Sequence, residues 1–118
     1  MYKKFLVITG PAGSGKTHLA KFISSQFANH EWVDHSTYHY TTKKSIFEFY
    51  DNWVKSQERP QIIVIDAFFS FDQIRKISGE IRDIVNTRGW AAIPIIFTTQ
   101  DDVPLNWDSL DFDVFRLK

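Results

Sequence analysis

Apolar residues along this chain fall into two alternating patterns, one typical of strands and the other typical of helices. Short runs of consecutive apolar residues predict strands that are buried on both faces of a sheet. We expect strands at residues 5–9, 32–35, 61–66, 93–99 and 112–117, the second being the weakest. Because Pro94 lacks the N–H that a strand interior needs, the fourth strand should begin at or just after it.

Between these runs, apolar residues recur every three or four positions, which is the spacing of an amphipathic helix. The three predicted stripes are Leu19, Phe22, Ile23 and Phe27; then Ile46, Phe47, Phe49, Tyr50, Trp53 and Val54; and last Ile74, Ile77, Ile81, Ile84 and Val85. The first helix should begin near Lys16. Ser70 and Gln73 match a capping box before the third helix, and Gly89 should end it.

The alternation of strands and helices predicts an α/β fold, with a mainly parallel five-stranded sheet between two helical layers. At 118 residues, we expect one domain that spans residues 1–118. Fourteen basic and fourteen acidic residues give zero net charge, so nucleic acid is not indicated as a partner. The chain has no cysteine and no apolar run near the roughly 18 residues of a membrane span, so we expect a soluble, cytoplasmic protein.

One turn carries the strongest chemical signal. Residues 10–17 match the phosphate-binding pattern G-x-x-x-x-G-K-[ST] in full. Glycines let successive backbone N–H groups point at a phosphate, and the helix that follows adds its positive end. Lys16 is expected to reach the β- and γ-phosphates and Thr17 to bind Mg²⁺. The residues expected to hold the nucleotide are Gly10, Pro11, Ala12, Gly13, Ser14, Gly15, Lys16, Thr17 and His18.

This turn resembles the Walker A motif of P-loop nucleoside triphosphatases, and residues 62–66 resemble the Walker B strand of the same superfamily. The resemblance implies that Asp66 holds Mg²⁺ together with Thr17. Residues 95–100 resemble the next strand of the AAA+-like branch, whose tip places a polar residue beside the γ-phosphate. Thr98, Thr99 and Gln100 are the candidates, and we assign Thr99. The AAA+-like resemblance also implies the sheet order 5-1-4-3-2.

The chain departs from the AAA+-like pattern where the catalytic base is expected. Ala67 follows Asp66, at the position where that branch usually has the glutamate that activates water. An alanine methyl group cannot accept a proton. Asp34, at the end of the second predicted strand, is the first alternative, and Asp101 and Asp102 are further ones.

Two other parts of the AAA+-like pattern are missing. The segment just before the last strand, residues 106–111, has no arginine to act as an arginine finger, and Arg88 and Arg116 do not lie at the matching position. No helical lid is expected after the core, so the resemblance is to a minimal form. A second copy or another protein is therefore the expected source of the finger.

Together these residues predict an ATP-binding module, for ATP or another nucleoside triphosphate, with Mg²⁺-dependent hydrolysis of low intrinsic rate. The predicted catalytic residues are Lys16, Asp66, Thr99 and Asp34. A nucleotide-binding switch or assembly module without hydrolysis is the alternative. A small-molecule or nucleotide kinase is less favoured, because the five arginines are scattered and no arginine-rich lid segment follows.

Overall fold

The computed structural model describes residues 5–34, 52, 55, 59–68, 71–88, 93–101, 103 and 112–117. Its elements are β1 (Phe5–Thr9), α1 (Lys16–Ser24), β2 (His30–Asp34), β3 (Ile62–Phe68), α4 (Phe71–Arg88), β4 (Ile95–Thr99) and β5 (Phe112–Arg116). All five expected strands are present, as are the first and third expected helices. The second expected helix lies largely outside the described residues, although Asn52 and Lys55 are helical.

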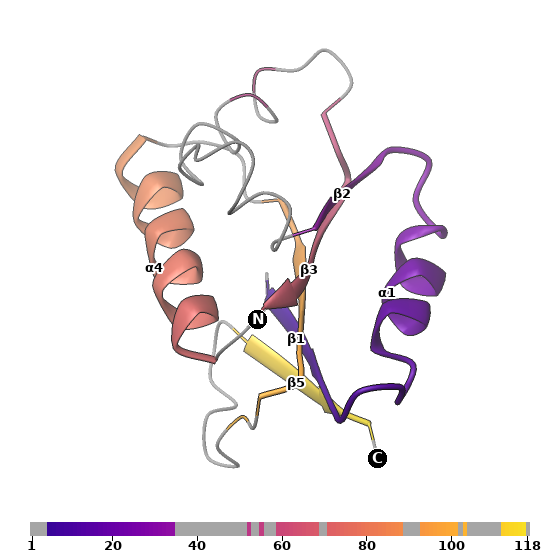
Figure 1. Cartoon of the computed structure of the whole chain (residues 1–118). Helices are drawn as coiled ribbons and strands as arrows, with labels where there is room; N and C mark the ends of the chain where they lie inside the picture. The colour runs from indigo at the N-terminus through magenta and orange to yellow at the C-terminus, as the bar shows by residue number, and fades with distance from the viewer. Residues whose placement is uncertain are drawn as a thin grey trace.

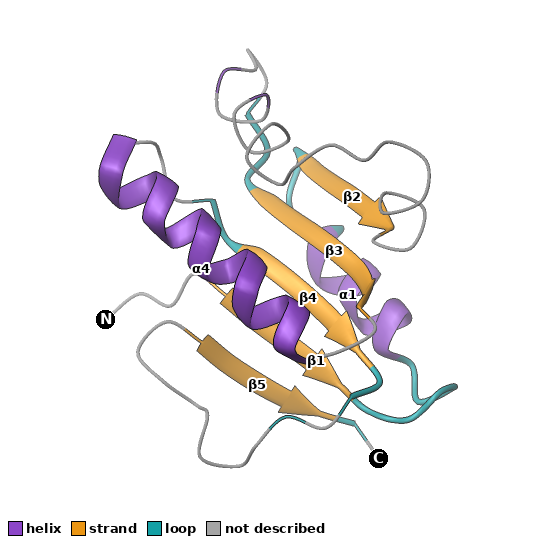
Figure 2. Ribbon diagram, turned by 60° about the vertical axis from the view of Figure 1, so that its left-hand side comes forward, coloured by secondary structure: helices purple, strands orange, loops and turns teal. Residues whose placement is uncertain are grey.

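The five strands form one sheet in the order β2-β3-β4-β1-β5, and every neighbouring pair is parallel. This is the predicted order 5-1-4-3-2 counted from the other edge, so the prediction is confirmed. Helix α1 covers one face of the sheet and α4 covers the other, which gives the expected three layers (Figures 1 and 2).

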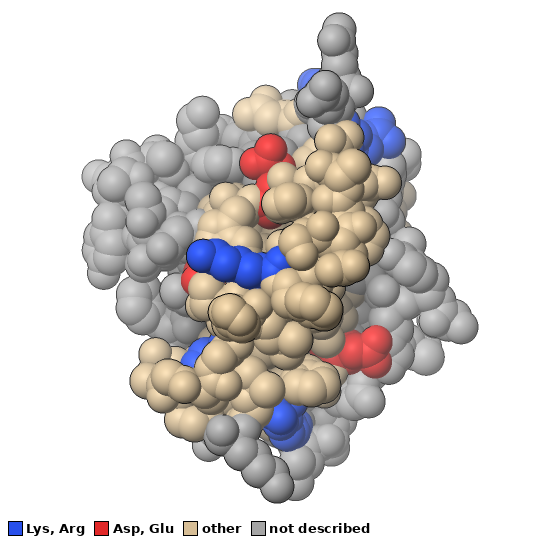
Figure 3. Space-filling view, turned by 90° about the vertical axis from the view of Figure 1, so that its right-hand side faces the viewer, with Lys and Arg blue, Asp and Glu red and all other residues tan. Residues whose placement is uncertain are grey.

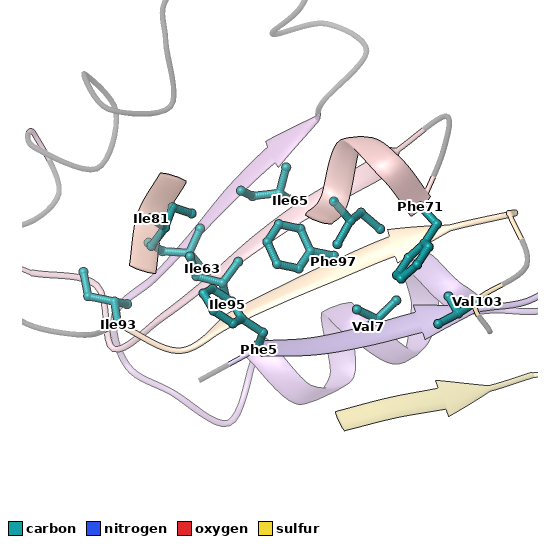
Figure 4. Packing of buried hydrophobic residues seen from close by; sticks show 11 residues of the cluster. Phe5, Val7, Ile63, Ile65, Phe71, Ile81, Ile93, Ile95, Phe97 and Val103 are labelled. Atoms are coloured by element: carbon teal, nitrogen blue, oxygen red, sulfur yellow. The ribbon is translucent and has the colours of Figure 1, made fainter. Parts of the chain in front are cut away.

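Alternate residues of the central strands supply the two cores. On β3, Ile63 and Ile65 pack on the α4 side, whereas Ile62 and Val64 pack on the α1 side. Figure 4 shows the α4-side core, which consists of Phe5, Val7, Ile63, Ile65, Phe71, Ile74, Ile81, Ile93, Ile95, Phe97 and Val103. Because both faces are covered, these strands carry continuous apolar runs rather than an apolar–polar alternation.

Both helices begin at the carboxyl edge of the sheet, the edge toward which all the strand arrows point (Figure 2). Helix α1 follows β1 after the glycine-rich turn, and α4 follows β3 after two intervening residues. The helix N-termini and the strand ends therefore meet at one edge. In parallel α/β sheets this is the edge where ligands bind.

Strand β3 continues two residues beyond its predicted end at Asp66. Ile65 lies opposite Phe97 and Phe68 lies opposite Thr99, so two residues of β3 face the single residue Thr98 of β4. This one-residue insertion is a β-bulge, a feature that re-aims side chains and often lies beside functional sites. Among the described helices, none is both long enough and apolar enough to cross a membrane.

Candidate functional site

The glycines of the turn between β1 and α1 meet two different needs. Gly13 and Gly15 have φ angles of 77° and 94°, in the left-handed region that disfavours residues with a side chain. A Cβ atom at either position would meet nothing within 4 Å. At Gly10 the constraint is space, since a Cβ would lie 2.8 Å from Ser14 Oγ and 2.9 Å from the Leu117 carbonyl oxygen.

Backbone hydrogen bonds fix the turn to the strands on either side of β1. The Gly10 N–H donates to the Thr99 carbonyl of β4 at 3.3 Å, and the Leu117 N–H, just after β5, donates to the Thr9 carbonyl at 2.8 Å. Within the turn, the Ser14 N–H donates to the Pro11 carbonyl at 3.2 Å. The base of the turn is thus anchored while its tip, which includes Pro11, is exposed.

Positive charge gathers at the mouth of this turn. Lys16 Nζ donates to the Pro11 carbonyl at 2.8 Å, so the ammonium group lies folded over the turn. Helix α1 begins here with Gly15 as its N-cap residue, which has no side chain to accept a hydrogen bond, and its first turn has no acidic residue. The first N–H groups of a helix have no partner within the helix, so they and the ammonium favour an anion.

Three side chains from three elements meet beside the turn. The Thr17 hydroxyl, from the first turn of α1, lies 3.2 and 3.3 Å from the two carboxylate oxygens of Asp66. The Thr98 hydroxyl of β4 donates to Asp66 Oδ1 at 2.5 Å. Asp66 is only 9% exposed and Thr98 only 1%. The structure therefore brings the predicted metal ligands Thr17 and Asp66 together.

Thr99 lies elsewhere. Neighbouring residues of a strand point to opposite faces, so with Thr98 on the α1 side, Thr99 lies on the α4 side of the sheet. Its hydroxyl accepts a hydrogen bond from the Asp101 N–H at 3.1 Å. Of the three candidates at the tip of β4, Thr98 is the one in contact with Asp66, while Gln100 is exposed. The assignment of Thr99 beside a γ-phosphate stays a prediction.

The candidates for the catalytic base have different positions. Asp34 ends β2 and pairs in register with Asp66 of β3, so their backbones are neighbours at the carboxyl edge. Asp101 binds the backbone at the start of α4: its Oδ2 accepts a hydrogen bond from the Phe71 N–H at 2.8 Å. Asp102 lies outside the described residues. The assignment of Asp34 stays a prediction.

The remaining predicted residues take simple positions. His18, in the first turn of α1, is exposed, as is Ala12 at the tip of the turn. Arg116 ends β5 opposite Thr9, at the same edge as the glycine-rich turn, whereas Arg88 ends α4 at the far edge. Residues 106–111, where the AAA+-like pattern expects the finger, lie outside the described residues.

Sequence reasoning missed two supporting contacts. One is the Asp101–Phe71 bond, for which a local capping box was expected instead; its Ser70 lies outside the described residues. The other is the packing of Leu117 against Gly10. Both contacts join segments far apart in the sequence, so no local pattern announces them.

Charged side chains are dispersed over the surface in the described part of the chain. On the face that carries α1, the visible lysine and arginine side chains are separated from one another rather than gathered in a patch (Figure 3). Within the same described residues, no three His, Cys, Asp or Glu side chains form a group that could hold a metal by themselves. A cation at Asp66 would therefore need ligands from elsewhere, as Mg²⁺ does when it binds with a phosphate.

Comparison with known proteins agrees with this geometry. A crystal structure of the DnaC helicase loader is similar in fold, with a TM-score of 0.52 and 17% sequence identity over 98% of this chain and 78% of that one. No curated protein sequence matches the chain. Over residues 1–105, the sequence matches the family described as Novel STAND NTPase 3 (nSTAND3). The glycine-rich turn, the sheet order and this match confirm the predicted P-loop NTPase superfamily, and the chain belongs to the nSTAND3 family.

Proposed function

We propose that this P-loop NTPase module binds ATP, or another nucleoside triphosphate, with Mg²⁺ and hydrolyses it slowly. The observation that carries the proposal is the meeting of Thr17 and Thr98 on the buried carboxylate of Asp66, directly beside the phosphate-binding turn. A glycine-rich turn that arose by chance would have no reason to lie beside a buried acid. Here Asp66, which lies 49 positions after Thr17 in the sequence, accepts a hydrogen bond from the Thr17 hydroxyl.

The turn is suited to a triphosphate. Its two left-handed glycines leave open space where side chains would otherwise project, and Ser14 Oγ is buried without a hydrogen-bond partner among the described residues. Lys16 holds its ammonium group over the turn on a single carbonyl acceptor. A phosphate oxygen would be a stronger, charged acceptor for that ammonium group.

The oxygen atoms of Thr17 and Asp66 suit Mg²⁺. This ion prefers oxygen ligands and is commonly bound by one or two carboxylates together with substrate phosphates and waters. Thr17 and Asp66 would hold it, and it would supply positive charge to the β- and γ-phosphates. Thr98 keeps one oxygen of Asp66 in place by donating to it, so the carboxylate remains oriented toward Thr17.

We expect slow hydrolysis because of the residue that follows Asp66. Ala67 offers no proton acceptor at the position where the AAA+-like branch has its base. Asp34, in register with Asp66 on the neighbouring strand, is the acid we propose as the substitute. A second copy of the chain or a partner protein would supply the arginine finger. Because Ala67 cannot act as a base, a nucleotide-binding switch without hydrolysis is the second candidate function.

Nucleotide binding is the first test. A fluorescent ATP analogue is titrated with and without Mg²⁺ against the wild type, Lys16→Ala and Asp66→Asn. Lys76→Ala is the matched control, because it removes the same charge from an exposed position of α4. We expect Lys16→Ala to bind at least about tenfold more weakly, which corresponds to the loss of one charge-assisted contact. Equal binding by Lys16→Ala and Lys76→Ala would refute the proposal.

Hydrolysis is tested separately, by phosphate release at increasing protein concentration. We expect a low rate that rises faster than in proportion to concentration if a second copy completes the site, and Lys16→Ala should abolish it. Ala67→Glu should raise the rate by restoring a proton acceptor, whereas Ala67→Gln, of equal size and without that basicity, should not. Binding without release in the wild type and in Ala67→Glu would favour the nucleotide-binding switch.

A further inference from the structure

Asp101 joins three elements at the carboxyl edge of the sheet. Its carboxylate Oδ2 accepts a hydrogen bond from the N–H of Phe71, the first residue of α4, at 2.8 Å. Its own N–H donates to the Thr99 hydroxyl at 3.1 Å, and its carbonyl accepts a hydrogen bond from the Thr9 hydroxyl at 2.5 Å. One residue therefore connects the ends of β1 and β4 to the first turn of α4.

The same two strand ends carry the proposed nucleotide site on the opposite side of the sheet. Thr9 directly precedes Gly10, the first residue of the phosphate-binding turn. Thr99 directly follows Thr98, which donates to Asp66. Thr9 and Thr99 are partners in the β1–β4 register, and the Gly10 N–H donates to the Thr99 carbonyl. A movement of either strand end would therefore alter both the turn and the contacts of Asp101.

We propose that Asp101 is a positioning residue of the nucleotide site, and that it couples the first turn of α4 to nucleotide binding. The inference rests on the proposed function. A carboxylate at a helix N-terminus is favoured by the helix dipole. The Asp101–Phe71 bond therefore holds the ends of β1 and β4 in place relative to the first turn of α4. Since coupling between two sites is reciprocal, a nucleotide that steadies the strand ends also steadies this bond.

A purely stabilising helix cap is the competing explanation, and the choice of variants separates the two. Asp101→Ala removes the carboxylate and leaves the backbone bonds to Thr9 and Thr99. Asp101→Asn keeps a side-chain oxygen that can accept from the Phe71 N–H. Ile81→Val is the matched control, because it trims a residue of α4 that is 2% exposed in the α4-side core and does not touch Asp101.

The first readout is the dissociation constant of a fluorescent ATP analogue with Mg²⁺. We expect Asp101→Ala to raise it about three- to tenfold, the effect of losing roughly one hydrogen bond to a charged group that is partly screened by water. Asp101→Asn should restore most of the affinity. Ile81→Val should bind as tightly as the wild type, although it loosens the same helix.

The second readout is hydrogen exchange of the backbone amides in the first turn of α4, including Phe71. Adding the Mg²⁺–ATP analogue should slow exchange there in the wild type, and Asp101→Ala should lose this response. The wild-type measurement needs no variant, so it can refute the coupling even if Asp101→Ala does not fold. Exchange at Phe71 that the nucleotide leaves unchanged would overturn the proposed coupling.

The outcomes also separate this inference from the proposed function. If the wild type binds nucleotide and Asp101→Ala binds it equally well, Asp101 has no positioning role, and the proposed function stands. If Ile81→Val weakens binding as much as Asp101→Ala does, the effect belongs to helix stability and the positioning role is refuted. If the wild type does not bind, the proposed function fails, and the role of Asp101 fails with it.

Discussion

The hydroxyl of Thr98 offers a sharp test of how the site is held together. Thr98→Val keeps the shape of the side chain and removes the donor to Asp66 Oδ1. Thr98 is 1% exposed and Asp66 is 9% exposed, so water has little access to replace the lost donor. In this variant Asp66 still accepts from the Thr17 hydroxyl, but those distances, 3.2 and 3.3 Å, are longer than the 2.5 Å between Thr98 and Asp66.

The expected loss can be compared between the two neighbouring threonines. A hydrogen bond to a charged group contributes about 1.5–3 kcal/mol, so Thr98→Val should lower the free energy of unfolding by about that amount. Thr99→Val is the matched control, because Thr99 is equally buried and its hydroxyl accepts from a neutral backbone N–H. Loss of a neutral bond should lower the free energy of unfolding by only about 0.5–1.5 kcal/mol.

Urea denaturation of both variants beside the wild type measures these free energies, with the slope of the transition confirming that the unfolded state is unchanged. The Mg²⁺-dependent affinity for an ATP analogue is then measured on the same proteins. We expect Thr98→Val to lose more stability and more Mg²⁺-dependent affinity than Thr99→Val. The reverse order would refute the reasoning that Thr98 orients Asp66.

Three further substitutions test the turn, helix α4 and the core, each by the midpoint of urea or thermal unfolding. Gly10→Ala should lower the free energy of unfolding by about 1–3 kcal/mol, because its Cβ would collide with Ser14 Oγ and the Leu117 carbonyl; an unchanged midpoint would contradict the crowding. Gly79→Ala should raise it by up to about 1 kcal/mol, since α4 has open space there. Phe97→Ala, at the centre of the α4-side core, should lower it by about 3–5 kcal/mol, and a loss below 1 kcal/mol would contradict its full burial.

The hydrophobic pattern predicted the central elements well because both faces of their strands are buried. β1 has the predicted bounds, and α4 ends at Arg88, one residue before the glycine expected to end it. The edge strand β2 begins two residues earlier than predicted, at His30. Its first two residues, His30 and Glu31, are polar and pair with β3, so hydropathy does not mark them as part of a strand.

The site was only partly predictable, for a related reason. The glycine-rich turn is a local pattern, so its residue types and their spacing identify it from the sequence alone. The choice between Thr98 and Thr99 depends on which face of β4 meets α1, and a strand with two apolar faces does not reveal this. Asp101 acts on residues 30 and 92 positions away in the sequence, so only the folded chain shows its role.

The start of helix α1 has a consequence for the lifetime of the protein. Asp101 caps α4, whereas Gly15 leaves the first N–H groups of α1 without a side-chain acceptor. An anion bound there would accept hydrogen bonds from these N–H groups, as a capping side chain does. The free energy of unfolding would then depend on the concentration of the ligand. At a ligand concentration of one hundred times the dissociation constant, this linkage adds about 2.7 kcal/mol to the free energy of unfolding. A cell depleted of nucleotide would then hold a form of this protein that opens more often and that proteases degrade faster.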